Sequence, residues 1–206
     1  SLVMLCRALE KRSGPEQVPG LYYRQEGRIT GNNPGLPPRD FNQLPSPDRR
    51  SLSEAYQKKR YFMVLVRQRP VETLLTSRGC PFRCRFCSNI PGRFRARSPD
   101  SVLEEIVARY QNGIRHFDVA DANFTFDIGR SLAIFDRIIK EKLDIAFRFK
   151  SRTTSITPEL VHKARQAGAY LISLVLESGS QQILDRMNKK TTISGNIAAC
   201  KTVLET

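Results

Sequence analysis

Apolar residues follow two kinds of pattern over the second two thirds of the chain, and the two patterns alternate. Short apolar runs, the first of them rich in β-branched residues, predict strands at 71–76, 114–120, 144–149 and 170–176. Segments with apolar residues at helical spacing predict a helix after each run, at 98–112, 128–142, 157–167 and 180–187. Because strands that alternate with helices form parallel sheets through right-handed crossovers, the pattern predicts an α/β fold with a parallel sheet.

The predicted helices begin with capping signals. Ser98 and Thr157 each precede a proline and then an acidic residue, an order typical of helix N-termini. Ser180 is predicted to cap the helix at 180–187. Residues 194–206 also follow a helical pattern, which predicts a further helix at the end of the chain.

The first 60 residues have a different composition. A helix is predicted at 1–12 and a short hairpin with a Glu-Gly turn at 18–30. Residues 31–50 are rich in Pro, Asn, Gly and Asp, as in a linker. A helix and then an extended segment are predicted at 51–70, before the first strand of the α/β pattern.

The length and composition are those of a globular protein. The 206 residues are enough for one sizeable core, and 40% of them are hydrophobic, as in a globular protein. No apolar run reaches the length of a membrane helix, and the N-terminus does not resemble a signal peptide. We therefore expect a protein with no membrane span.

The chain is strongly basic, with a net charge of +14. Such a balance favours an anionic partner, which is a nucleic acid, an anionic lipid or a phosphorylated substrate; a solvated basic surface is the alternative. The aromatic residues are few and not interleaved with the basic ones, which argues against a nucleic acid. Arginines are dense around three closely spaced cysteines, at Arg78, Arg83, Arg85, Arg93, Arg95 and Arg97.

Those cysteines, Cys80, Cys84 and Cys87, form a C-x3-C-x2-C motif. Thiolates this close together suit zinc or an iron–sulfur cluster better than a disulfide framework, and free thiols in an odd total of five cysteines fit a reducing cytoplasm. A structural zinc site takes four protein ligands, whereas three ligands on a four-iron cluster leave one iron open for catalysis. The remaining candidate ligands are isolated from one another: Cys6, Cys200, His116 and His162.

With its flanks, T-S-R-G-C-P-F-R-C-R-F-C-S, the motif resembles the signature of radical S-adenosylmethionine (SAM) enzymes. The resemblance implies a 4Fe–4S cluster held by Cys80, Cys84 and Cys87, which are then both metal ligands and catalytic residues. It implies that SAM binds the open iron and is cleaved to a 5′-deoxyadenosyl radical, with an electron donor such as flavodoxin or ferredoxin. The implied fold is a partial TIM-like (βα)6 barrel, of which about four units are present here.

Upstream of the cysteines, P-G-L-Y-Y-R at 19–24 and L-P-S-P-D at 44–48 resemble the junction between a cobalamin-binding domain and a radical SAM core. This resemblance implies a piece of a longer protein. Residues 1–60 would be the edge of the cobalamin-binding domain with its linker, and residues 61–206 the first part of the core. The cobalamin-binding residues would precede Ser1. The expected chemistry is methyl transfer, or radical cyclisation or rearrangement, on a small-molecule or anionic substrate.

The resemblance also assigns SAM contacts to residues at the strand ends. Phe86 would lie against adenine, and Arg152 would pair with the SAM carboxylate through its planar guanidinium. Asp121 follows the second strand, where the family binds the SAM amino group; a second acid, common in the cobalamin subgroup, is replaced by Ala122. Taken singly, such residues have structural alternatives, as turn formers or surface charges. The full predicted set is Phe86, Asp121, Asn123, Ser151, Arg152, Glu177, Ser178 and Gly179.

Two alternatives stay open. A methylthiotransferase acting on RNA or a ribosomal protein fits the basic charge, but that family carries three further cysteines upstream, and only Cys6 precedes Cys80 here. A zinc-stabilised nucleic-acid-binding module would explain the cysteines and the charge, but not the repeated strand–helix pattern.

Overall fold

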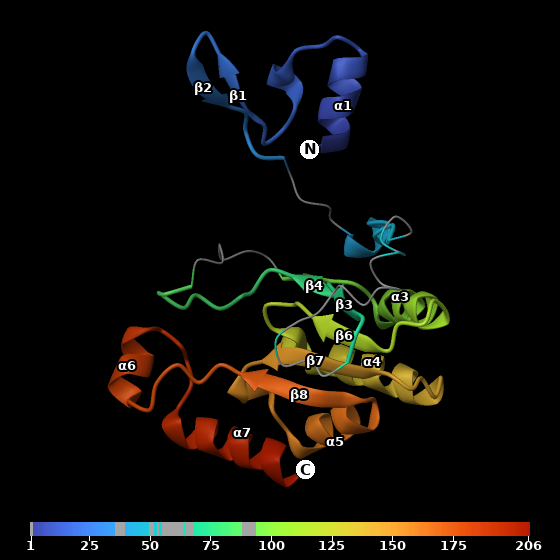
Figure 1. Cartoon of the computed structure of the whole chain (residues 1–206). Helices are drawn as coiled ribbons and strands as arrows, with labels where there is room; N and C mark the ends of the chain where they lie inside the picture. The colour runs from blue at the N-terminus through green and yellow to red at the C-terminus, as the bar shows by residue number, and fades with distance from the viewer. Residues whose placement is uncertain are drawn as a thin grey trace. The chain divides into compact units, whose positions relative to one another are not determined.

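The structure is a computed structural model that describes residues 2–35, 40–49, 52, 54, 64, 68–87 and 94–206 (Figure 1). The chain divides into two compact units, Ser1–Arg39 and Asp40–Thr206. Most of the helix and extended segment predicted at 51–70 lies outside the described residues.

The first unit consists of a helix and a two-stranded hairpin. α1 spans Leu2–Glu10, and β1 (Tyr22–Gln25) pairs antiparallel with β2 (Arg28–Gly31). The turn places Glu26 and Gly27 at φ 49° and φ 80°, as in the two-residue turns whose twist suits a hairpin. The predicted helix and hairpin are confirmed.

The second unit contains a parallel sheet with the strand order β3-β6-β7-β8 (Figure 1). Each strand lies where the sequence pattern predicts one, with ends that differ by a few residues. The prediction of an α/β fold with a parallel sheet is therefore confirmed. The strands are β3 (Val71–Leu74), β6 (His116–Val119), β7 (Ala146–Ser151) and β8 (Ala169–Leu174).

A helix follows each of these strands. Ser180 stands at the N-cap position of α6, as predicted, but its side chain makes no capping hydrogen bond; its amide donates to Ser178 Oγ (3.1 Å). Within the described part of the chain, no helix combines the length and the apolar composition needed to cross a membrane. The helices are α3 (Pro99–Gln111), α4 (Ile128–Lys140), α5 (Pro158–Gln166), α6 (Gln181–Arg186) and α7 (Ile193–Glu205). A side chain caps the N-terminus of α3, α4, α5 and α7; the capping residues are, in that order, Ser98, Asp127, Thr157 and Thr192.

Short elements connect the strands to the helices. β4 (Ser77–Arg78) follows β3 and pairs antiparallel with β5 (Arg95–Ala96). Short 3-10 helices follow β6 and β7 within a few residues of the strand ends. The 3-10 helices lie at Pro15–Gln17, Phe41–Gln43, Phe124–Phe126 and Thr153–Ser155.

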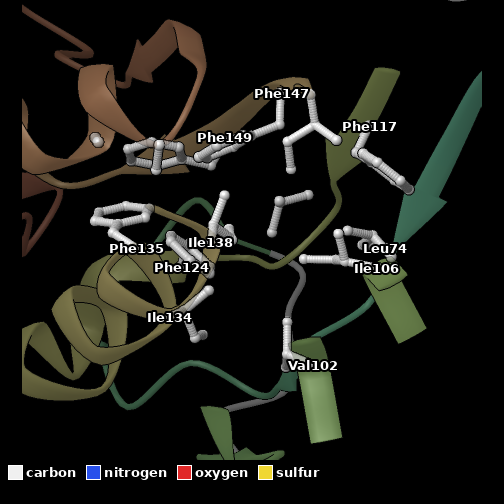
Figure 2. Packing of buried hydrophobic residues seen from close by; sticks show 14 of the residues in the cluster. Leu74, Val102, Ile106, Phe117, Phe124, Ile134, Phe135, Ile138, Phe147 and Phe149 are labelled. Atoms are coloured by element: carbon white, nitrogen blue, oxygen red, sulfur yellow. The ribbon is translucent and has the colours of Figure 1, made fainter. Parts of the chain in front are cut away.

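The hydrophobic core lies between one face of the sheet and the helices α3, α4 and α5. Phe117, Phe147 and Phe149 project into it from alternate strand positions, and Figure 2 shows them with Phe124 and Phe135. The ring centroid of Phe135 lies 5.9 Å from that of Phe147 and 6.0 Å from that of Phe149. This interlocked aromatic packing holds the strands, and therefore their ends, at fixed positions.

Buried glutamates anchor the sheet at β3. The Glu72 carboxylate accepts hydrogen bonds from Arg109 Nε (2.9 Å) and Nη2 (2.6 Å). Glu105, on α3, pairs with Arg49 (3.0 Å) and with Arg97. Because a buried carboxylate without a partner is costly, these pairs fix β3 and α3 to the segment that precedes the sheet.

We expect Phe135→Ala to lower the free energy of unfolding by about 3–5 kcal/mol, because the change removes a fully buried ring from the core. Leu204→Ala, at a side chain that is 85% exposed on α7, is the control and should change it by less than about 0.5 kcal/mol. Urea denaturation followed by circular dichroism measures both variants. Similar losses at the two positions would contradict the core shown in Figure 2.

Candidate functional site

The three cysteines lie in a loop that follows β4, beyond the carboxyl end of β3. Gly79 leads into this cysteine loop (residues 80–87) at φ 86°, a conformation that favours glycine. Cys80 and Cys84 are partly exposed, and Cys87 is exposed. The Cys87 amide donates to the Cys84 carbonyl (3.2 Å), which closes a turn between two of the thiols. The carboxyl edge of a parallel α/β sheet is where such folds hold their ligands.

A segment far along the chain supports the cysteine loop. This α6 loop (residues 187–190) follows α6. The Arg85 amide donates to the Met187 carbonyl (2.9 Å), and Asn188 Nδ2 donates to the Arg83 carbonyl (2.7 Å). Asn188 itself adopts φ 54°. The α6 loop thus satisfies backbone groups of the cysteine loop that would otherwise need water.

Arg152, directly after β7, faces the cysteine loop and is only 7% exposed. Its Nη1 donates to Cys84 Sγ (3.7 Å), and its Nη2 donates to the Lys189 carbonyl. The guanidinium carbon lies 3.8 Å from the centroid of the Phe82 ring. The predicted pairing of Arg152 with a SAM carboxylate stays a prediction; in this structure the guanidinium contacts protein groups.

Asp121, just beyond β6, is fully buried. Its carboxylate accepts hydrogen bonds from the Thr76 amide (2.7 Å), the Thr76 hydroxyl (2.5 Å) and the Ser77 hydroxyl (2.5 Å). Arg130, on α4, donates to the Thr76 carbonyl (2.9 Å). The side chain predicted to contact the SAM amino group therefore anchors the chain just before the cysteine loop.

Thr125 brings Asn123 and Ser151 together. The Thr125 hydroxyl lies 2.5 Å from Ser151 Oγ and donates to Asn123 Oδ1 (3.5 Å), and all three residues are buried. Asn123 Nδ2 is buried and has no hydrogen-bond partner among the described residues. Thr125 was not predicted from the sequence, although a hydroxyl two residues after Asn123 at a strand end was an available signal.

The residues after β8 contribute an ion pair and an open turn. Glu177 adopts φ 69°, and its carboxylate accepts from Lys189 Nζ (2.8 Å). Lys189 Nζ also lies 5.6 Å from the ring centroid of Phe86, which is 50% exposed. Ser178 Oγ accepts from a backbone amide, and a Cβ added at Gly179 would meet nothing within 4 Å. Lys189, which was not predicted from the sequence either, therefore connects Glu177 to Phe86.

Burial shifts the pKa values of two other titratable groups. Burial lowers the pKa of Arg130, and the charges of Asp121 and Asp127 oppose that shift. Burial also lowers the pKa of His116, against the charge of Asp144.

The described residues contain no group of three or more His, Cys, Asp or Glu side chains arranged to hold a metal ion. Cys80, Cys84 and Cys87 are free cysteines in one loop. Their assignment as cluster ligands stays a prediction from the motif.

Comparison with known proteins identifies the family. The profile of the radical SAM superfamily matches residues 74–206, a range that holds β6, β7, β8 and the whole C-x3-C-x2-C motif. The chain belongs to the radical SAM superfamily. The resemblance recognised in the cysteine motif is confirmed, and so is the prediction of an enzyme.

The chain matches parts of longer curated proteins. An uncharacterized methyltransferase from Pyrococcus horikoshii is 29% identical over 202 residues, which cover 96% of this chain and 42% of the relative. An anaerobic magnesium-protoporphyrin IX monomethyl ester cyclase from Rubrivivax gelatinosus is 34% identical over 125 residues, 58% of this chain and 22% of that protein. The chain thus spans less than half the length of either relative.

A solved structure matches nearly the whole chain. It is that of the cobalamin-dependent SAM radical enzyme OxsB with aqua-cobalamin and SAM bound, and its TM-score is 0.80 at 28% identity. The match covers 98% of this chain and 30% of that chain. The parallel sheet β3-β6-β7-β8 agrees with the partial TIM-like barrel that the resemblance implied.

The family implies a 4Fe–4S cluster and SAM, and the chemistry of the described residues fits both. The cysteine loop supplies three soft thiol ligands. At adjacent strand ends, Asn123 Nδ2 and Arg152 Nε are buried without a protein partner. Because buried polar atoms in folded proteins nearly always have partners, these two donors fit a polar ligand at this edge of the sheet.

We expect Asp121→Ala to destabilise the chain by about 2 kcal/mol or more, because donors on Thr76 and Ser77 lose their buried acceptor. Asp136→Ala, which removes a surface pair with Lys163, is the control and should cost less than about 1 kcal/mol. Urea denaturation compares the variants, and hydrogen exchange of the Thr76 amide reports on the anchor itself. Unchanged exchange at Thr76 in Asp121→Ala would contradict the anchoring role.

Proposed function

We propose that this chain is the first part of the core of a radical SAM enzyme, in which Cys80, Cys84 and Cys87 hold a 4Fe–4S cluster. One observation carries the proposal: the C-x3-C-x2-C loop follows the carboxyl end of a parallel sheet in a chain that matches the superfamily over residues 74–206. When bound, the cluster supplies the single electron that cleaves SAM to a 5′-deoxyadenosyl radical. An electron donor such as flavodoxin or ferredoxin would reduce it.

The residues at the strand ends would bind and orient SAM. The half-exposed ring of Phe86 offers an apolar face to adenine. Asn123 Nδ2 is a buried donor suited to a carboxylate or hydroxyl oxygen. Glu177 can accept from a ribose hydroxyl or an ammonium group through the oxygen that Lys189 leaves unused. The open turn at Ser178 and Gly179 lets a ligand approach the backbone.

Aromatic side chains beside the cysteine loop are suited to excluding water. The Phe126 ring packs against Phe82 (5.9 Å between centroids) and Phe94 (4.8 Å). A radical that abstracts hydrogen reacts with whatever lies beside it, so a site that makes one must position its substrate and keep solvent away. These three rings would form part of that enclosure.

We further propose that the full-length protein depends on cobalamin and catalyses methyl transfer, or radical cyclisation or rearrangement, on a small-molecule or anionic substrate. A methyltransferase and a cyclase among the relatives support this chemistry, as does the likeness to OxsB. Residues 1–60 would then be the edge of the cobalamin-binding domain with its linker, and residues 61–206 would begin the core. The same relatives favour this chemistry over a methylthiotransferase or a zinc-stabilised nucleic-acid-binding module.

Anaerobic reconstitution with iron and sulfide tests the proposal. We expect a brown protein with about four irons per chain, and a change in its electron paramagnetic resonance (EPR) spectrum when SAM is added. Cys84→Ala should abolish cluster binding, because a ligand is lost. Cys200→Ala, in α7 and outside the motif, should retain the cluster.

Metal analysis and EPR spectroscopy of the three proteins give the readouts. Two results would contradict the proposal: preferential binding of zinc by the same cysteines, or an iron content that does not depend on Cys84. Only the first result would favour the zinc-stabilised module.

A further inference from the structure

We infer that Arg152 is a positioning residue that holds a fixed positive charge against the ligand Cys84 and thereby raises the reduction potential of the cluster. The inference rests on the proposed function, because it concerns the cluster that the cysteine loop would hold. It goes beyond that function in giving Arg152 a role toward the cluster, where the sequence suggested a role toward SAM.

Three contacts fix the Arg152 side chain. Nη1 donates to Cys84 Sγ (3.7 Å), Nη2 donates to the Lys189 carbonyl, and the guanidinium stacks on the Phe82 ring at 3.8 Å. With 7% of its surface exposed, the side chain has little room to swing into solvent. The planar fork of arginine suits this arrangement, because one edge can meet a carbonyl and a thiol while the face meets a ring.

The position of Arg152 is set from two distant parts of the chain. β7 places its backbone at the carboxyl edge, and the α6 loop presents the Lys189 carbonyl to its guanidinium. The α6 loop also binds the cysteine loop directly, through Asn188 and through Met187. Arg152, the cysteine loop and the α6 loop therefore form one hydrogen-bonded assembly.

The charge of Arg152 bears directly on the cysteine thiolate. A guanidinium stays protonated throughout the pH range in which proteins fold. Among the nearby cations, Lys189 pairs with the Glu177 carboxylate at 2.8 Å, so that pair adds little net charge, whereas Arg83 and Arg85, which flank Cys84, are exposed and screened by solvent. Reduction adds a negative charge to a cluster that thiolates already make anionic. A buried cation beside one ligand stabilises the reduced form and raises the potential.

The test compares two substitutions that differ in charge. Wild type, Arg152→Gln and Arg152→Lys are reconstituted anaerobically, and EPR-monitored redox titration without SAM gives each midpoint potential. We expect Arg152→Gln to shift the midpoint to a more negative value and Arg152→Lys to stay near wild type. Arg186→Gln, at an exposed position in the last turn of α6, controls for the loss of a surface cation and should leave the midpoint unchanged.

If a variant binds too little iron for its midpoint potential to be measured, its cluster content is compared with that of the wild type instead. Loss of the cluster in Arg152→Gln with retention in Arg152→Lys supports a requirement for the charge. Loss in both variants overturns the inference, because shape rather than charge would then be essential. An unchanged midpoint in Arg152→Gln, or an equal shift in both variants, also overturns it.

The same variants also distinguish this inference from a role of Arg152 in binding SAM and from failure of the proposed function. Equilibrium binding of SAM to each reconstituted variant is measured alongside the potential. A loss of SAM affinity in Arg152→Gln with an unchanged midpoint would overturn the inference and assign Arg152 to the SAM carboxylate. Failure of the wild type itself to hold a cluster would instead contradict the proposed function.

Discussion

The carboxyl edge of the sheet depends on the hydrogen bonds that the buried Asp121 carboxylate accepts from Thr76 and Ser77. These two residues stand just before the cysteine loop, at the junction of β3 with β4. Arg130, from α4, binds the Thr76 carbonyl on the other side of the same peptide segment. A loop of mostly exposed residues therefore leaves the sheet from a point that a neighbouring strand end and a helix hold in place. The residues that hold Thr76 and Ser77 therefore set the direction in which the loop leaves the sheet.

Two of the arginines around the cysteines, Arg78 and Arg97, have a structural use. Arg97 pairs with the buried Glu105, which Arg49 also contacts, and Arg78 lies 5.4 Å from the centroid of the Phe41 ring. Such arginines stabilise the fold by neutralising buried acids or covering apolar rings. The net charge of +14 is therefore a poor guide to a partner, because part of it compensates groups inside the protein.

Local signals predicted the elements well because each has a local cause. Serine and threonine caps mark the starts of α3 and α5, and the runs of apolar residues mark the strands. The cysteine motif was recognisable for the same reason, since all its residues lie within one loop. Strand ends then pointed to Asn123 and Glu177, because the carboxyl ends of parallel strands meet at one edge. This rule gives only the general position of these residues. It does not give the hydrogen-bond partner of each side chain.

Those partners come from distant segments that no local pattern reveals. Arg83 and Asn188 are 105 positions apart, and Arg152 and Lys189 are 37 apart. The use of Asp121 inside the protein likewise depends on residues 45 and 44 positions earlier in the chain. A sequence shows that an acid stands at a strand end, but the direction of its carboxylate depends on which hydroxyls the folded chain brings there.

The α6 loop has a consequence for how the protein matures. All three cysteines leave the ribosome about a hundred residues before Met187 and Asn188, so a nascent chain carries its thiols long before it can form the loop that supports them. Pairings across such long separations form late, because loop-closure entropy opposes them. The support that Met187 and Asn188 give the cysteine loop is therefore a late product of folding.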